Sequence, residues 1–188
     1  AQRKIFDYLG KQIAEWDLGG QKRYRISYLK EPGRYFDNTS VCIYVIDIQD
    51  KKRLGEALSY FSDVINQFQE LELSDVKIHV FFHKLDPSYV KEQSQVKLTG
   101  QINDLEDKIS KIVKEEFDTS FHETTIYDLW TLVSAFSNIL LELYPQSDLL
   151  DKTMNEFAEK LSPCDGILVL DSNSLVIGQF FRDDTAKD

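Results

Sequence analysis

Two apolar runs, separated by a long segment of helical period, most constrain the fold of this 188-residue chain. Residues 41–48 and 76–82 are almost continuously apolar, which is typical of strands covered on both faces of a parallel sheet. Between them, apolar side chains recur at steps of three and four from Leu54 to Leu71, which predicts an amphipathic helix. Strand, helix and strand in this order form a crossover unit, so the sequence predicts an α/β protein.

The alternation of strands and helices continues on both sides of this unit. A Gly-containing turn between the runs 3–8 and 12–16 predicts a β-hairpin, and the polar, Tyr-rich stretch after it predicts a loop with a short helix. After the second buried strand, we expect a long helix over about 88–116, a short strand over 117–124 and a helix over 127–143. The predicted fold is a doubly wound α/β domain, with a mostly parallel sheet that carries one antiparallel edge hairpin.

A change of pattern near Pro145 divides the chain into residues 1–145 and a shorter tail, 146–188. The tail is too small to hold a core of its own, so it is predicted to be the start of a second, α+β domain or to lean on the first. Its expected elements are a helix over 149–161 and two strands, 166–170 and 174–181.

Charge and cysteine content exclude several classes of function. The 22 basic and 32 acidic residues give a net charge of −10, which disfavours nonspecific binding to nucleic acid or to an anionic membrane. No apolar run reaches the roughly 18 residues that a membrane span needs. Cys42 and Cys164 have no second ligand at metal-binding spacing, so we expect two isolated thiols in a reduced, cytoplasmic protein; a disulfide between them is the alternative.

Three polar motifs follow predicted strands, where open α/β sheets bind their ligands. The first is Asp17-Leu-Gly-Gly-Gln21. An acid at a strand end can hold Mg²⁺ through water, Gly20 leaves its N–H open to a terminal phosphate, and Gln21 can orient an attacking water. The alternative is a simple turn that ends the strand, since Asp and Gly are turn formers.

The second and third motifs suit recognition of a guanine base. In His83-Lys-Leu-Asp86, a carboxylate can accept from guanine N1–H and N2–H₂, a donor pair that adenine lacks, while the stem of Lys84 lies over the ring. In the loop containing Thr125 and Ile126, a backbone N–H could reach guanine O6. Judged alone, these segments are an Asp-Pro turn and a Thr cap on the next helix.

Taken in this order, the three motifs resemble those of a small GTPase. Asp-Leu-Gly-Gly-Gln is similar to the Arf-like and Rag-like branches, and His-Lys-x-Asp, with His83 in place of the usual Asn, resembles the Rag/Gtr family. The stretch Thr124-Thr-Ile-Tyr-Asp128 is similar to that family's last base-contacting loop. The tail, with Cys164-Asp-Gly-Ile-Leu-Val-Leu170, is similar to the start of a roadblock/longin-like dimerisation domain.

The resemblance implies a role for each matching residue. Asp17 holds Mg²⁺ through water, Gly20 contacts the γ-phosphate of GTP, and Gln21 positions the attacking water. The remaining motif residues hold the base of GTP or GDP, and residues 22–38 form the second switch region. The base-binding residues are His83, Lys84, Asp86, Thr125 and Ile126.

The chain departs from the family pattern at the phosphate-binding loop. The motif Gly-x-x-x-x-Gly-Lys-Ser/Thr does not occur in its 188 residues. We expect this loop to precede residue 1 in a longer protein; the alternative is a degenerate GTPase. Because that loop supplies many of the phosphate contacts, this chain alone is expected to bind nucleotide weakly, to be inactive in GTP hydrolysis and to be marginally stable.

The function implied is that of a regulatory GTPase whose nucleotide state controls partner recruitment in nutrient signalling. Expected partners are a related GTPase, in a homo- or heterodimer, and scaffold or regulator proteins. Recruitment to an endolysosomal or vacuolar membrane would be indirect, through a scaffold. Two alternatives stay open: a non-catalytic pseudo-GTPase that serves as a dimerisation module, and an Arf-like trafficking GTPase.

Overall fold

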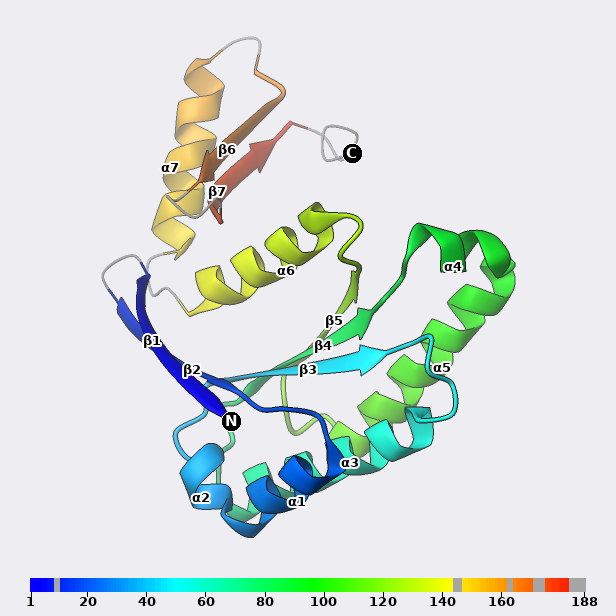
Figure 1. Cartoon of the computed structure of the whole chain (residues 1–188). Coiled ribbons are helices and arrows are strands. Elements are labelled where there is room, and N and C mark those ends of the chain that lie inside the picture. Colours follow the sequence, from blue (N-terminus) through cyan, green and yellow to red (C-terminus); the bar gives the residue numbers. More distant parts are fainter. Residues whose placement is uncertain (9–10, 144–146, 162–163, 171–174, 183–188) are drawn as a thin grey trace. The chain divides into compact units, whose positions relative to one another are not determined.

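Three parallel strands form the central sheet of the larger of two compact units in the computed structural model (Figure 1). The structure describes residues 1–8, 11–143, 147–161, 164–170 and 175–182. The strands are β3 (Val41–Asp47), β4 (Lys77–His83) and β5 (Thr119–Thr124), in the order β3-β4-β5. Pairing is parallel throughout, which confirms the α/β class and the parallel sheet.

Two long amphipathic helices provide the main core of this unit. They are α3 (Leu54–Glu70) and α5 (Gln95–Val113), which contact each other and lie on the same side of the sheet (Figure 1). Their apolar stripes meet alternate side chains of β4, so the periodicity of three and four in the sequence correctly indicated the buried faces. The fully buried members include Phe61, Ile65, Phe68, Ile78, Val80, Phe82 and Ile109.

The predicted long helix over 88–116 is wrong. The structure has a short helix α4 (Pro87–Glu92) and the separate helix α5. Gln93 takes an extended conformation with ψ of 145°, and the Ser94 side chain then accepts a hydrogen bond from the N–H of Lys97, which caps the new helix. A helix-capping residue inside a periodic pattern thus marks a boundary that periodicity alone does not show.

The segment before the central sheet forms the predicted hairpin and two short helices. Strands β1 (Gln2–Tyr8) and β2 (Lys11–Asp17) form a two-stranded sheet of their own. Helices α1 (Lys22–Lys30) and α2 (Pro32–Tyr35) follow, and α1 contacts α3. The two strands are close in sequence, so their pairing has a small entropic cost.

Strand β3 is less buried than its apolar sequence predicts. Ile43 is 36% exposed and Val45 is 56% exposed, so the prediction that residues 41–48 are covered on both faces is wrong. Among the described strands, β3 pairs with β4 alone. A strand with one neighbour offers its side chains fewer contacts than a central strand such as β4, where five consecutive residues are buried.

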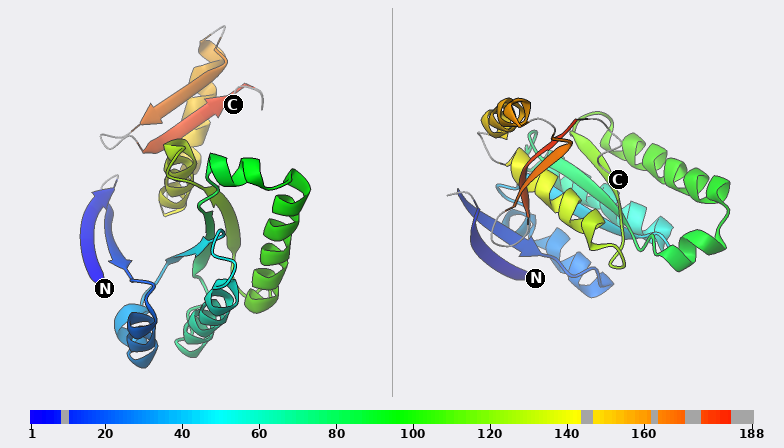
Figure 2. Two further views of the ribbon diagram at one scale, coloured as in Figure 1. Left: turned by 45° about the vertical axis from the view of Figure 1, so that its right-hand side comes forward. Right: turned by 90° about the horizontal axis from the view of Figure 1, so that it is seen from above.

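The smaller compact unit comprises residues 7–11 and 129–188. Its elements are α6 (Leu129–Glu142), α7 (Ser147–Lys160), β6 (Gly166–Leu170) and β7 (Val176–Phe181). The antiparallel pair β6–β7 forms a separate sheet against which α7 lies (Figure 2), and Val176 N–H donates to Ser137 Oγ of α6 at 2.9 Å. The predicted domain boundary at 145/146 and the turn at 171–174 lie outside the described residues.

Within the described part of the chain, no helix combines the length and the apolar composition that crossing a membrane requires. Cys42 and Cys164 are free thiols, as the sequence predicts. Burial raises the pKa of the Cys42 thiol to about 12, which keeps it protonated at neutral pH and makes it a poor nucleophile.

Candidate nucleotide-binding site

The carboxyl ends of the three parallel strands lie in register. Asp47, the last residue of β3, is opposite His83, the last residue of β4, and His83 is opposite Thr124 at the end of β5. The turns that follow these three residues therefore start at one edge of the sheet. This register places the second and third sequence motifs side by side, as the strand-end argument predicts.

Asp86 is held by hydrogen bonds to both of its carboxylate oxygens. The Thr125 hydroxyl donates to Oδ1 at 2.7 Å, and Gln49 Nε2 donates to Oδ2 at 3.0 Å. Thr125 is only 5% exposed, and its Oγ1 also accepts from the backbone N–H of Tyr127 at 3.2 Å. The half-buried Asp86 carboxylate is thus fixed by one group from each neighbouring turn.

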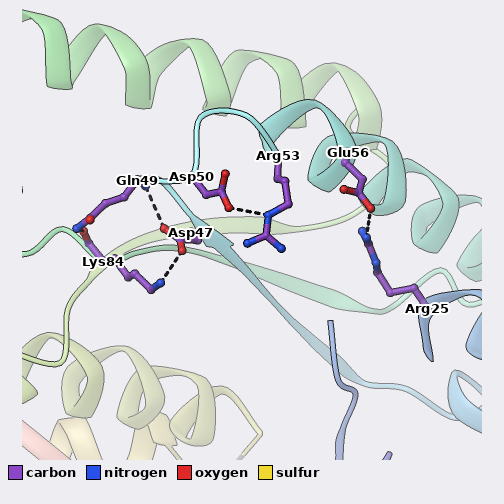
Figure 3. A network of polar contacts seen from close by, with 7 residues as sticks. All are labelled: Arg25, Asp47, Gln49, Asp50, Arg53, Glu56 and Lys84. Carbon is purple, nitrogen blue, oxygen red and sulfur yellow. Dashed lines mark hydrogen bonds and ion pairs between the residues drawn. The ribbon is translucent and has the colours of Figure 1, made fainter. Parts of the chain in front are cut away.

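Lys84 lies in a strained backbone conformation beside this carboxylate. Its φ of 68° is in the left-handed region, which costs a non-glycine residue on the order of 1 kcal/mol. The turn is held in place because Lys84 O accepts from Gln49 Nε2 at 2.7 Å and Lys84 Nζ donates to Asp47 Oδ2 at 2.6 Å (Figure 3). Backbone strain of this kind is concentrated at functional sites.

The Asp47–Lys84 pair changes the acid–base properties of both groups. Burial alone would raise the pKa of Asp47, but the hydrogen bond and the charge of Lys84, with the backbone N–H groups of Gln49 and Asp50, lower it overall. The same hydrogen bond and charge raise the pKa of Lys84. Both groups are therefore charged at neutral pH, and both line an open hollow of about 470 Å³ with Gln49, Asp50, Lys51 and Lys52.

His83 and Thr124 connect the turn after β4 to the end of β5. His83 Nδ1 and Thr124 Oγ1 share a hydrogen bond of 3.0 Å, and Leu85 N–H donates to Thr124 O at 3.1 Å. His83 therefore has a partner in the neighbouring loop. Ile126, by contrast, is 63% exposed, so its side chain is left free of the core while its backbone follows Thr125.

Asp17 is the last residue of β2, and Gly20 and Gln21 follow this strand, which lies in the other sheet of this unit. All three are exposed, and no hydrogen bond within the described residues joins them to the turns after β3, β4 and β5. Gln21 O accepts from the N–H groups of Tyr24 and Arg25, so this residue begins α1 while its side chain makes no capping bond. A Cβ added at Gly20 meets nothing within 4 Å, which leaves that backbone open to approach.

Helix α1 is anchored by aromatic and ionic contacts. Arg25 forms an ion pair with Glu56 of α3 (Figure 3). Its guanidinium also lies over the Tyr60 ring, at 5.1 Å from the ring centroid. Burial raises the pKa of the Tyr28 hydroxyl, and the backbone N–H of Gly19 opposes this rise. The start of the predicted second switch region is thus tied to α3.

Asp17 alone does not form a complete metal site. Among the described residues, no group of three or more His, Cys, Asp or Glu side chains could hold a metal ion. Mg²⁺ in nucleotide sites uses one or two carboxylates, waters and the phosphates of the substrate, so a single exposed carboxylate fits that mode of binding. Asp17 thus has the chemistry for water-mediated Mg²⁺ binding, with the other ligands supplied from elsewhere.

The residues joined by the hydrogen bonds at the ends of β3, β4 and β5, named the base-recognition cluster below, are Asp47, Gln49, Lys84, Asp86 and Thr125. Sequence reasoning missed two of them. Asp47 ends an apolar strand and Gln49 follows it, which is the same signal that selected Lys84 and Asp86. The strand-end argument could have found them, because parallel strands end at the same edge of the sheet. Their bonds to Lys84 and Asp86 depend on the register of β3 against β4, which no local pattern specifies.

In this parallel α/β sheet, a lysine and a carboxylate follow one strand, and a loop with a buried threonine hydroxyl follows the next. This is the architecture of a small GTPase. Comparison with known proteins identifies the family. The sequence model of the Gtr1/RagA G protein conserved region matches residues 4–187. The chain therefore belongs to the Gtr1/RagA family, which confirms the Rag/Gtr resemblance.

The most similar relatives include Ras-related GTP-binding proteins of two kinds. The chain is 25% identical over 174 residues to Ras-related GTP-binding protein A of Dictyostelium discoideum, an alignment covering 90% of this chain and 54% of the relative. It is also 25% identical over 175 residues to Ras-related GTP-binding protein B of Rattus norvegicus and of Mus musculus, covering 92% of this chain and 44% of each relative. The chain thus spans about half the length of these curated relatives.

Proposed function

We propose that this chain recognises the guanine base of GTP and GDP through Asp86 and Lys84. The observation that carries the proposal is the pair of hydrogen bonds that fix the Asp86 carboxylate at the end of the parallel sheet. A carboxylate fixed in this way accepts from guanine N1–H and N2–H₂, while adenine would leave it unpaired. Lys84 covers the ring with its stem, and His83, Thr125 and Ile126 complete the base pocket.

The proposal extends to the phosphate end of the nucleotide. Asp17 would hold Mg²⁺ through water, and Mg²⁺ supplies charge neutralisation for the phosphates. Gly20, whose surroundings leave its backbone open, would donate its N–H to the γ-phosphate, and Gln21 would orient the attacking water. These three residues begin the segment that leads into α1, so loss of the γ-phosphate would be communicated to that helix.

We further propose that the protein acts as a nucleotide-controlled switch in nutrient signalling, paired with a related GTPase. In this role the smaller unit is a roadblock-like dimerisation element. Its support is the alternation along β6, in which Leu168 is 44% exposed and Leu170 is 50% exposed on the same side of the strand. Recruitment to an endolysosomal or vacuolar surface would then come from a partner scaffold.

A dimerisation module without nucleotide binding is the second candidate, and the same exposed leucines favour it. The Arf-like trafficking alternative has less support. It would gain support if residues 149–181 packed as a helix with no separate sheet, whereas β6 and β7 form a separate antiparallel pair. The match to the Gtr1/RagA region, which extends to residue 187, also favours the Rag/Gtr type.

The test is a titration of fluorescent GDP and GTP into the full-length gene product and into this 188-residue chain. We expect the full-length protein to prefer guanine over adenine nucleotides. Asp86→Asn places an amide N–H₂ against the donors of guanine, so its affinity for GDP falls by about 10²–10⁴-fold, the loss of two charge-assisted hydrogen bonds. Xanthine nucleotides offer one donor and one acceptor at this edge, so they bind Asp86→Asn more tightly than they bind the wild-type protein.

The control is Asp50→Asn, the same chemical change three residues after Asp47. Asp50 pairs with Arg53 at 2.6 Å rather than with the base-recognition cluster (Figure 3), so this variant keeps its preference for guanine. A full-length protein that binds no guanine nucleotide, or that binds adenine nucleotides equally well, refutes the proposed function and leaves the dimerisation module.

A further inference from the structure

Gln49 occupies a position from which one amide nitrogen serves two acceptors. Its Nε2 donates to Lys84 O at 2.7 Å and to Asp86 Oδ2 at 3.0 Å. A glutamine amide has two N–H donors, so both bonds form without sharing a proton. The amide cannot be reversed, because Gln49 Oε1 would then face a carbonyl oxygen and a carboxylate oxygen.

The backbone that carries Gln49 is held from several directions. Gln49 N–H donates to Asp47 Oδ1 at 3.1 Å, and the other oxygen of Asp47 is the one that accepts from Lys84 Nζ. The preceding residue, Ile48, is fully buried, its N–H donates to His83 O, and its carbonyl accepts from Gln101 Nε2 at 2.9 Å. An exposed side chain therefore projects from a fixed segment, which reduces the entropy lost when it binds Asp86.

We propose that Gln49 is a positioning residue for guanine recognition: it sets the rotation of the Asp86 carboxylate and so the selectivity for guanine. This inference rests on the proposed function, because it assigns Asp86 to the base. Gln49 itself does not touch the nucleotide in this scheme. It acts through the carboxylate and through the carbonyl of Lys84, and thus holds the two base-binding residues of the turn at once.

The Asp86 carboxylate has enough acceptor positions to bind two protein donors and the guanine base at once. An ionised carboxylate has about four acceptor positions, two on each oxygen. Thr125 uses one position on Oδ1 and Gln49 uses one on Oδ2, which leaves one on each oxygen for guanine N1–H and N2–H₂. A single donor would leave the carboxylate free to rotate about its Cβ–Cγ bond, whereas two donors fix its plane.

The experiment compares Gln49→Ala and Gln49→Glu with wild type in the full-length gene product. Binding of GDP and of inosine 5′-diphosphate, which lacks the 2-amino group, is measured by competition with a fluorescent nucleotide. For Gln49→Ala, we expect GDP affinity to fall about tenfold, the lower end for one hydrogen bond to a charged group, and inosine diphosphate affinity by about threefold or less. The affinity for GDP falls further in Gln49→Glu, because a second carboxylate repels Asp86.

The matched control is Gln67→Ala in α3. Gln67 Nε2 also donates to a carboxylate, that of Glu70 at 2.9 Å, within the same helix and outside the base-recognition cluster. Gln67→Ala should change neither the dissociation constant of GDP nor that of inosine diphosphate. The ratio of the two constants is the decisive readout, because general destabilisation weakens both nucleotides equally and leaves the ratio unchanged.

The outcomes separate this inference from the proposed function. A reduced preference for GDP in both Gln49 variants, with the Gln67 variant unchanged, supports the positioning role. A wild-type protein that prefers GDP while the Gln49 variants keep the same ratio overturns the positioning role and leaves the proposed function intact. If wild-type protein binds no guanine nucleotide, the proposed function and this inference both fail, and Asp86 has no base to recognise.

Discussion

Replacing Thr125 with valine is the most direct test of how the base-recognition cluster is held together. Valine keeps the size and the branched shape of threonine, so the substitution removes a hydroxyl and changes little else. That hydroxyl donates to Asp86 Oδ1 at 2.7 Å and accepts from Tyr127 N–H at 3.2 Å. Because Thr125 is 5% exposed, water reaches its position poorly. We expect Thr125→Val to destabilise the larger unit in the absence of any nucleotide.

The magnitude follows from the two hydrogen bonds. A bond to a charged group contributes about 1.5–3 kcal/mol and a neutral one about 0.5–1.5 kcal/mol. Asp86 keeps its bond to Gln49, and Tyr127 is 71% exposed, so its N–H can turn to water. These two compensations place the loss near the lower end, at about 2 kcal/mol. For a chain of this size, that loss lowers the melting temperature by about 4–8 °C.

The assay is urea unfolding followed by far-ultraviolet circular dichroism, with the midpoint and the slope compared between variants. The control is Thr119→Val at the start of β5, the strand that ends just before Thr125. Its hydroxyl donates to the neutral Phe117 O at 3.1 Å, so its removal costs about 1 kcal/mol or less. Equal losses for the two variants, or a loss below about 0.5 kcal/mol for Thr125→Val, would refute the reasoning that Asp86 is held by a charge-assisted bond.

Two further predictions concern stability. Asp47→Asn lowers the free energy of unfolding by about 1 kcal/mol or less between pH 5 and 8, since Asp47 and its partner Lys84 are both partly exposed. Lys84 lowers the pKa of Asp47 in the folded state below its unfolded value of about 3.9. The loss of stability in Asp47→Asn is therefore present above pH 4 and disappears as the pH falls through the lowered pKa. Urea titrations of both proteins at several pH values measure it. Phe61→Ala leaves a cavity where the ring was fully buried and costs about 3–5 kcal/mol by urea unfolding; a cost below about 1 kcal/mol would show that α3 is not packed as described.

The elements with one strong period could be predicted from the sequence. The helical stripe of α3 gave its buried residues correctly, including Phe61 and Phe68, and the run before His83 gave a fully covered strand. Both succeed because a buried face requires apolar side chains at fixed steps. The exposure of Val45 on β3 could not be predicted in the same way, since a continuous apolar run does not specify how many neighbours the strand has.

The candidate site divides along a similar physical line. That Lys84, Asp86 and Thr125 lie close together could be predicted, because each follows a strand and parallel strands end at the same edge of the sheet. Gln49 could not be assigned to Asp86, since its contact depends on β3 and β4 ending at the same level. A shift of one residue in that register would move Asp47 away from His83 and turn its side chain to the opposite face.

This dependence on register gives the residues after β3 an influence on the motif after β4. Asp47 binds the ammonium of Lys84, and Gln49 binds both its carbonyl and the carboxylate of Asp86. The left-handed backbone of Lys84 stores strain that these bonds offset, so weakening them releases the turn rather than a single side chain. Substitutions of Asp47 and Gln49 should therefore alter the recognition of guanine while every residue of the His-Lys-x-Asp motif is retained.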